Sequence, residues 1–160
     1  MARLSDLKLV YRLWMEAYPY RRVDWRPGTR LSKPLSAARI ALVTTAGFSL
    51  PDQRPFDPAI RGGDWSFREI PADADLSTLR IGQTSDAFDH RGIEADPNLA
   101  LPLNRLRELR RDGQIGEVAP RHFSLMGSIS APGRLIKESA PAIAEQLVQD
   151  AVDAVLLTPV

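Results

Sequence analysis

Cysteine is absent from the 160 residues. Disulfides, thiolate nucleophiles and structural zinc sites built on sulfur are therefore excluded for this sequence. Neither sign of charge dominates, because 21 lysines and arginines stand against 20 aspartates and glutamates, for a formal net charge of +1. This balance gives no support to general nucleic-acid binding or to an acidic substrate channel.

Long hydrophobic runs are also absent. No apolar stretch approaches the roughly 20 residues that a membrane-spanning helix needs. The first residues, MARLSDLKLVYRLW, contain scattered charges and no small-residue cleavage site, so we expect neither a secretory signal nor membrane contact. The length suits one globule, which at this size buries about 68–70% of its unfolded surface. We therefore expect a cytoplasmic globular protein.

Two apolar runs predict the centre of the fold. Residues 40–43, IALV, do not alternate with polar residues, which is typical of a strand buried on both faces. The run breaks at Thr44-Thr45-Ala46-Gly47, and such loops form the ligand crevice at the carboxyl ends of strands in open α/β sheets. Residues 154–157, followed by Thr158, repeat the design, so we expect both loops at one edge of one sheet.

The predicted fold class is α/β, with an open, mainly parallel sheet and packed helices in a Rossmann-like three-layer arrangement, incomplete at the carboxyl end. Residues 38–160 would form this domain, and residues 1–37 an amino-terminal segment. In that segment the apolar spacing of residues 5–17 predicts an amphipathic helix, capped by Ser5, that packs on the domain or binds a partner.

A basic arm follows this helix. Residues 20–34 mix arginines with Trp25 and two prolines, a composition that can bind single-stranded nucleic acid. The run is short and Asp24 interrupts it, so we favour a solvated arm and expect no nucleic-acid partner.

Further elements are predicted along the rest of the chain. The helix at 102–112 would point its arginines into solvent, and Ser139 would cap the last helix. The expected elements are an edge strand at 65–70, strands at 79–83 and 115–118, helices at 102–112 and 139–150, and a loop at 119–127.

Two groups of polar residues are candidates for chemistry. Asp86, Asp89 and His90 have the spacing of a shared metal site or of an oriented acid–base pair, or they form a turn whose carboxylates bind backbone amides. His122, beside Arg121, is the second of only two histidines and is also expected in a loop. A metal site formed by both histidines and a carboxylate is one hypothesis.

The loop after the first strand is a third candidate. Thr44, Thr45 and Gly47 could offer backbone N–H groups and hydroxyls to a carboxylate or phosphate. The loop lacks the GxGxxG pattern, so it does not predict a dinucleotide site.

Five sequence blocks follow the order of one known family. They are ALVTTAGF, GDWSFREIP, SDAFDHRGIEADPNLALPLNRLREL, IGEVAPRHFSLMG and VDAVLLTPV. Together they span roughly residues 38–160 and resemble the selenoprotein B family of glycine, sarcosine, betaine and D-proline reductases and its uncharacterised relatives. The resemblance implies reductive cleavage of a C–N bond in an amino acid or its N-methyl derivative by a selenolate or thiolate.

The resemblance also suggests roles and partners. It implies a small amino-acid substrate and a protein partner carrying redox thiols. We also expect an oligomer, and we expect no metal and no cofactor in this chain. His90 or His122 would transfer protons, because imidazole titrates near neutral pH. The residues expected to line the substrate site are Thr44, Thr45, Gly47, Asp86, Asp89 and Thr158.

One departure from the family is expected to matter. In the family, the strand matching residues 152–158 leads into a motif with selenocysteine or cysteine, whereas this sequence stops at Val160. We expect a selenocysteine directly after Val160 in the full-length product, with the sequence truncated at its UGA codon. The genomic DNA after codon 160 tests this. Two alternatives are a non-catalytic scaffold subunit and a metal-assisted hydrolase that uses the Asp/His cluster.

Overall fold

The computed structural model describes residues 8–18, 24, 28–83 and 89–160. Contacts divide the chain into two compact units, residues 1–30 and 31–160, and each is taken by itself. The first unit contains α1 (Leu9–Ala17), which confirms the predicted amphipathic helix over these residues. Ser5 and most of the basic arm lie outside the described residues. Whether α1 packs on the domain or binds a partner stays a prediction.

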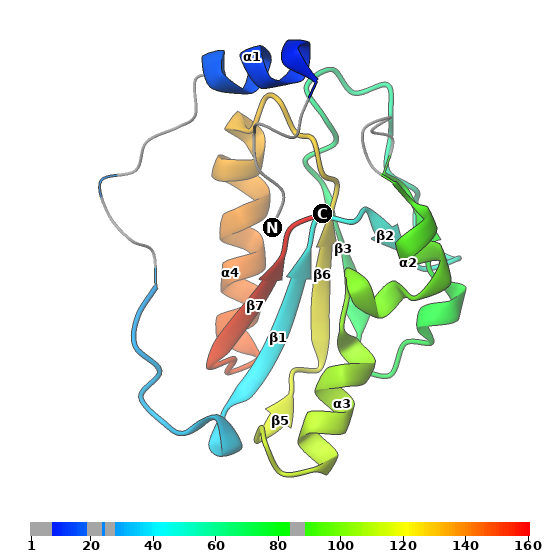
Figure 1. The fold of residues 1–160 in the computed structure, drawn as a ribbon. Coiled ribbons are helices and arrows are strands. Elements are labelled where there is room, and N and C mark those ends of the chain that lie inside the picture. The colour runs from blue at the N-terminus through cyan, green and yellow to red at the C-terminus, as the bar shows by residue number, and fades with distance from the viewer. Residues whose placement is uncertain (1–7, 19–23, 25–27, 84–88) are drawn as a thin grey trace. The chain divides into compact units, whose positions relative to one another are not determined.

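The second unit is built on a five-stranded sheet (Figure 1). Its central strand is β1 (Arg39–Thr44), which runs parallel to β7 (Ala154–Thr158) on one side. On the other side β1 runs parallel first to β5 (Glu117–Val118) and then to β6 (Arg121–Leu125). The edge strand β3 (Phe67–Pro71) is antiparallel to β6. The sheet is therefore mainly parallel, as predicted.

Helices cover both faces of this sheet. Leu42 of β1 belongs to the core cluster that includes two buried leucines of α3 (Leu103–Arg111). Val43, which points to the opposite face, packs on the cluster that contains Ile143 of α4 (Ala140–Gln149). Burying a side chain of this size contributes about 1.5–3 kcal/mol. The α/β prediction, with helices on both sides of the sheet, is confirmed.

Short elements connect these layers. A small antiparallel ladder pairs β2 (Phe48–Ser49) with β4 (Arg80–Ile81), which confirms strand structure within residues 79–83. The others are η2 (Leu35–Ala37), η3 (Leu76–Thr78), α2 (Arg91–Ala95), η4 (Pro97–Leu99) and η5 (Leu135–Ser139), the last a π-helical turn.

The loop prediction for residues 119–127 is wrong, because residues 121–125 form β6, an interior strand of the sheet. Its sequence, RHFSL, lacks the apolar run expected of a buried strand, because two of its buried side chains, His122 and Ser124, are polar. Arg121, at its start, forms an ion pair with Asp150, its Nε 2.6 Å from a carboxylate oxygen, which satisfies the charge at the sheet edge.

The prediction that both strands are buried holds for β1 and is wrong for β7. Among the described residues β7 pairs only with β1, so its outer edge has no strand partner. Leu156 is 46% and Leu157 67% exposed. An apolar strand at a sheet edge has the same sequence pattern as a central strand, because the pattern does not show how many strands pair with it.

Two further side-chain predictions are corrected. Ser139 does not cap the last helix, since it has helical dihedral angles and its hydroxyl donates to the carbonyl of Trp65. Arg107 is not solely a solvated arginine: its guanidinium donates to the carbonyls of Ala72 and Ala74 at 2.7–2.9 Å. Arg107 thereby fastens α3 to the segment that follows β3.

Candidate functional site

The carboxyl ends of β1, β6 and β7 meet at one edge of the sheet, where the C label stands in Figure 1. In open α/β sheets this edge is where ligands bind, because the loops after parallel strands surround a crevice there. The expectation that the loops after β1 and β7 share this edge is confirmed by the contacts between them.

Three threonines join the two loops. The backbone N–H of Thr45 donates to the carbonyl of Thr158 at 3.2 Å, and the Thr44 hydroxyl reaches the same carbonyl at 3.3 Å. The Oγ1 of Thr45 accepts from the Val160 N–H at 2.9 Å. The Thr158 hydroxyl donates to the carbonyl of Ala100 at 2.6 Å, which brings the segment before α3 to this edge. Thr44, Thr45 and Thr158 therefore lie together, as predicted.

Gly47 completes this loop. Its φ of +69° lies in the left-handed region, and a Cβ atom there would lie 2.9 Å from the backbone nitrogen of Gln83. Its N–H donates to the carbonyl of Leu125 at 2.8 Å. The N–H groups of Thr45 and Ala46 are donated within the chain too. These N–H groups, which were expected to bind an anion, therefore already donate to acceptors within the chain. The role of the loop in substrate binding stays a prediction.

His122 lies inside the sheet and not in a loop. Its side chain is 0% exposed, and Nδ1 accepts the Leu42 N–H at 3.0 Å, so the imidazole substitutes for a carbonyl acceptor beside β1. Desolvation by burial, aided by the positive charge of Arg107, lowers the pKa of His122 from 6.5 to about 4. The ring is neutral at pH 7. This environment is typical of a structural histidine, and its predicted part in proton transfer stays untested.

The Asp86, Asp89 and His90 group is only partly visible, because Asp86 lies outside the described residues. Asp89 accepts hydrogen bonds from the backbone and side chain of Arg91, and these bonds hold the pKa of its carboxyl below the usual value. His90 directly precedes α2 and is half-buried. For Asp89 these contacts favour the turn interpretation.

A shared metal site receives no support from these residues. Nδ1 of His122 is bonded to the Leu42 N–H, and the Asp89 carboxylate is bonded to Arg91. Among residues 8–18, 24, 28–83 and 89–160, no group of three or more His, Asp or Glu side chains is placed to hold a metal ion.

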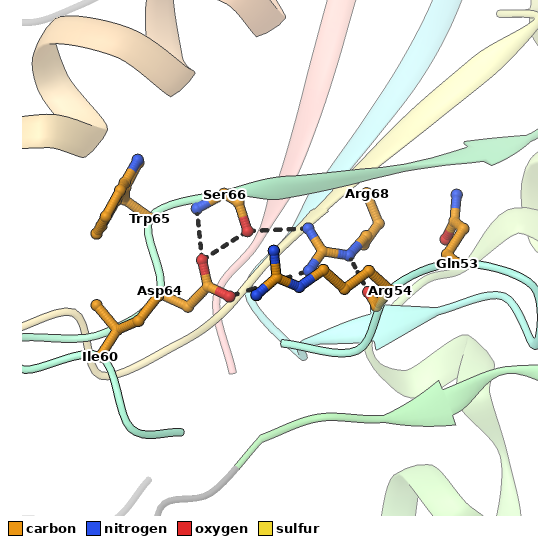
Figure 2. Close-up of a pocket in the computed structure, with 7 residues that line it drawn as sticks. All are labelled: Gln53, Arg54, Ile60, Asp64, Trp65, Ser66 and Arg68. Carbon is orange, nitrogen blue, oxygen red and sulfur yellow. Dashed lines mark hydrogen bonds and ion pairs between the residues drawn. The ribbon is translucent and has the colours of Figure 1, made fainter. Parts of the chain in front are cut away.

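A hollow of about 490 Å³ lies beside the same edge and was missed by sequence reasoning (Figure 2). Within residues 50–70 no spacing signals it, because its walls come from an irregular segment and from the start of β3. The residues that line it are Gln53, Arg54, Ile60, Asp64, Trp65, Ser66 and Arg68.

A buried carboxylate and a buried guanidinium form the wall of this hollow. Asp64 accepts from the N–H of Asp57 at 2.9 Å and from both the N–H and the hydroxyl of Ser66. Burial alone would raise the pKa of Asp64, but these bonds and the charge of Arg68 outweigh it and lower the pKa. Arg68 stacks over the Phe56 ring at 4.2 Å. Asp64 and Arg68 are thus held by contacts within the chain, and they give this wall of the hollow a fixed shape.

Comparison with known protein families identifies the family of the chain. The family described as "Glycine/sarcosine/betaine reductase selenoprotein B" matches residues 8–160. The chain belongs to this family. The match confirms the resemblance seen in residues 38–160 and extends it through the basic arm into α1. No solved structure matches the chain.

Curated relatives carry reductase names. The chain is 34% identical over 157 residues to the D-proline reductase subunit gamma of Acetoanaerobium sticklandii, an alignment that covers 97% of this chain and 62% of that protein. It is 30% identical over 144 residues to the sarcosine reductase complex component B subunit beta of Peptoclostridium acidaminophilum, covering 88% and 32%. A glycine reductase complex component B subunit gamma of Symbiobacterium thermophilum is 32% identical over 145 residues, covering 88% and 33%.

The chain thus spans 62% of the first of these relatives and about a third of the other two. Across the described residues, no helix combines the length and apolar character needed to cross a membrane.

Proposed function

We propose that this chain is a subunit of a selenoprotein B-type reductase that cleaves a C–N bond of a small amino acid or its N-methyl derivative. The observation that carries this proposal is the 34% identity to a D-proline reductase subunit over 97% of the chain. The convergence of the loops after β1 and β7 at the carboxyl edge of the sheet supports it, since this edge presents ligands in open α/β folds.

The reaction needs two nucleophilic groups that these 160 residues do not contain, because they include no cysteine. A selenolate or thiolate attacks the carbon that bears the nitrogen, and the amine leaves with a proton. A second thiol then attacks the selenium or sulfur, and the carbon leaves and takes up a proton. The two-electron oxidation product is a selenosulfide or disulfide. We propose that the first nucleophile is a selenocysteine or cysteine outside these residues and that a partner protein supplies the thiol.

The test is amine release by the assembled complex. The complex is purified anaerobically from its native cells and given dithiothreitol with glycine, sarcosine, glycine betaine or D-proline. We expect one substrate to yield ammonia, methylamine, trimethylamine or the ring-opened 5-amino acid, respectively. Removal of the complex with an antibody against this chain should remove the activity. Absence of product from all four substrates would contradict the proposal.

A non-catalytic subunit is the second candidate, and the absence of cysteine favours it. In that case the complex would retain its reductase activity after this chain is replaced by variants of its carboxyl-edge residues. Thr45→Val and Thr158→Val are suitable variants, because each removes a hydroxyl that forms hydrogen bonds at the edge. For the catalytic role we expect both to lower kcat/KM about tenfold or more.

A further inference from the structure

The hollow beside β3 adjoins the carboxyl edge of the sheet. Trp65 and Ser66 immediately precede β3, and the first residue of that strand, Phe67, pairs with Leu125 at the carboxyl end of β6. Gly63, in the same segment, approaches Ile129 so closely that a Cβ atom would lie 2.9 Å from its Cα. The segment that lines the hollow therefore leads into β3 and packs against the segment that follows β6.

The charged wall of the hollow has little bonding capacity left for a ligand. Nε of Arg68 donates to the carbonyl of Arg54 at 2.6 Å, and its other nitrogens donate to the Ser66 hydroxyl and to the carbonyls of Phe67 and Pro55. Both oxygens of Asp64 accept hydrogen bonds from within the chain. These groups therefore shape the hollow instead of recognising what enters it.

Arg54 differs from these groups. Its backbone carbonyl is fixed by Arg68, and Figure 2 shows its side chain extending into the hollow. In the described part of the chain, its guanidinium has no hydrogen-bond or ion-pair partner. With Arg54 and Arg68 against Asp64, the lining carries one net positive charge. A guanidinium in this position matches the geometry of a carboxylate, to which it can donate two parallel hydrogen bonds.

The other walls restrict the ligand further. Trp65 and Ile60 supply apolar surface, and the Trp65 ring is oriented by the Arg134 guanidinium, which stacks 3.5 Å from the ring centroid. The volume of about 490 Å³ is in the range of small-molecule sites. A phosphate dianion would face Asp64 with one charge left uncompensated, so a monoanion with a small apolar body fits better.

We propose that this hollow binds the carboxylate of a small amino acid or betaine, with Arg54 as the anchoring cation and Trp65 as the apolar wall. The choice of this ligand class rests on the proposed function. The site itself rests on the unpartnered guanidinium, the fixed wall and the position beside the carboxyl edge. A carboxylate held here would leave the rest of the ligand directed to the loops after the parallel strands.

The test is binding to the 160-residue chain, measured by isothermal titration calorimetry or ligand-observed NMR. The probes are glycine betaine, sarcosine and D-proline, with choline as a control that keeps the quaternary ammonium of betaine but has no carboxylate. Arg54→Gln is compared with Arg61→Gln, because both arginines are exposed and belong to the same segment, but only Arg54 lines the hollow. We expect at least one carboxylate to bind, choline and inorganic phosphate not to bind, and Arg54→Gln to weaken binding about tenfold or more. Arg61→Gln should change the affinity less than about twofold.

Unchanged affinity in Arg54→Gln, equal binding of choline, tighter binding of phosphate, or no binding of any carboxylate would each overturn this site. Because the Arg54 guanidinium has no partner among the described residues, its variant should melt within about 1–2 °C of the parent chain, and a melting curve shows that binding is not lost through unfolding. The experiment contains no thiol and no partner protein. If the complex cleaves a substrate but the 160-residue chain binds no carboxylate, only the proposed site is contradicted. If the chain binds a carboxylate but the complex releases no amine, only the proposed function is contradicted.

Discussion

At the scale of single residues, His122 couples the fold to pH. In the folded chain its pKa is about 4 against an ordinary 6.5, because the ring is desolvated and lies near the positive charge of Arg107. The unfolded chain therefore binds a proton that the folded chain excludes. Stability is full above about pH 6.5 and falls as the pH is lowered toward 4, by an amount on the order of 3 kcal/mol.

Urea unfolding at pH 7.5, 6.5, 5.5 and 4.5 measures this loss. His122→Asn, which retains an acceptor for the Leu42 N–H, should lower stability at pH 7.5 but remove most of the slope between pH 6.5 and 4.5. His90→Asn removes the other histidine of the chain and is the matched control. A slope that persists in His122→Asn and disappears in His90→Asn would contradict the assignment.

Alanine substitutions at Gly47 and Gly113 distinguish the cost of backbone strain from the cost of a steric clash. Their φ angles are +69° and +70°, so alanine is equally strained at both. A Cβ atom at Gly47 would lie 2.9 Å from the backbone nitrogen of Gln83, whereas at Gly113 nothing lies within 4 Å. We expect Gly47→Ala to cost at least about 1–2 kcal/mol more than Gly113→Ala in chemical denaturation. Equal costs would show that the β1 loop can relax.

At the scale of elements, β7 leaves an apolar edge on the sheet. Its residues AVLLT include no charge and no proline, the two features that commonly block edge-to-edge association. Leu157, which is 67% exposed, is the most accessible of them. We expect Leu157→Lys to change the free energy of unfolding by less than about 0.5–1 kcal/mol and to reduce concentration-dependent association in sedimentation velocity. The same substitution would not reduce association if β7 is not the contacting surface.

Helix α4 offers a second comparison within one element. Ile143 is buried against the sheet, whereas Val148 is 77% exposed. Ile143→Ala should cost about 2–5 kcal/mol, because it leaves a cavity, and Val148→Ala less than about 0.5 kcal/mol. Thermal and urea denaturation measure both. Similar costs for the two variants would mean that α4 covers the sheet with a different face.

The elements also show how far sequence reasoning reached. β1 was predicted because burial on both faces leaves an unbroken apolar run, and α3 because burial of one face leaves leucines at helical spacing. β6 was missed because its buried His122 and Ser124 interrupt the apolar run that a buried strand usually shows. The exposure of β7 was missed because it depends on which strands become neighbours, and the hollow at Arg54 because the irregular segment that lines it has no periodic pattern. The threonines at the carboxyl edge were found because strand ends are visible in the pattern.

At the scale of the whole molecule, β7 supplies the strand partner along one side of β1. Residues 40–44 of β1 pair with residues 154–158 one to one. A chain shortened to residues 1–153 should therefore lose its cooperative urea transition, because β1 would expose one side to water. The control replaces Leu156 and Leu157 by threonine, which keeps the backbone ladder and should keep the transition. Cooperative unfolding of the shortened chain would show that β5 and β6 suffice to hold β1.

The pairing of β1 with β7 also sets an order of events on the ribosome. The N–H of Arg39 bonds to the carboxylate of Asp153, 114 residues further along the chain. At about 5–20 residues per second, synthesis of these 114 residues leaves β1 without this neighbour for about 6–23 s. During that time the strand that later becomes the centre of the sheet is an open apolar edge. One side of β1 therefore stays without its strand partner until the last part of the second unit has been made, and contacts of such long range make folding slow.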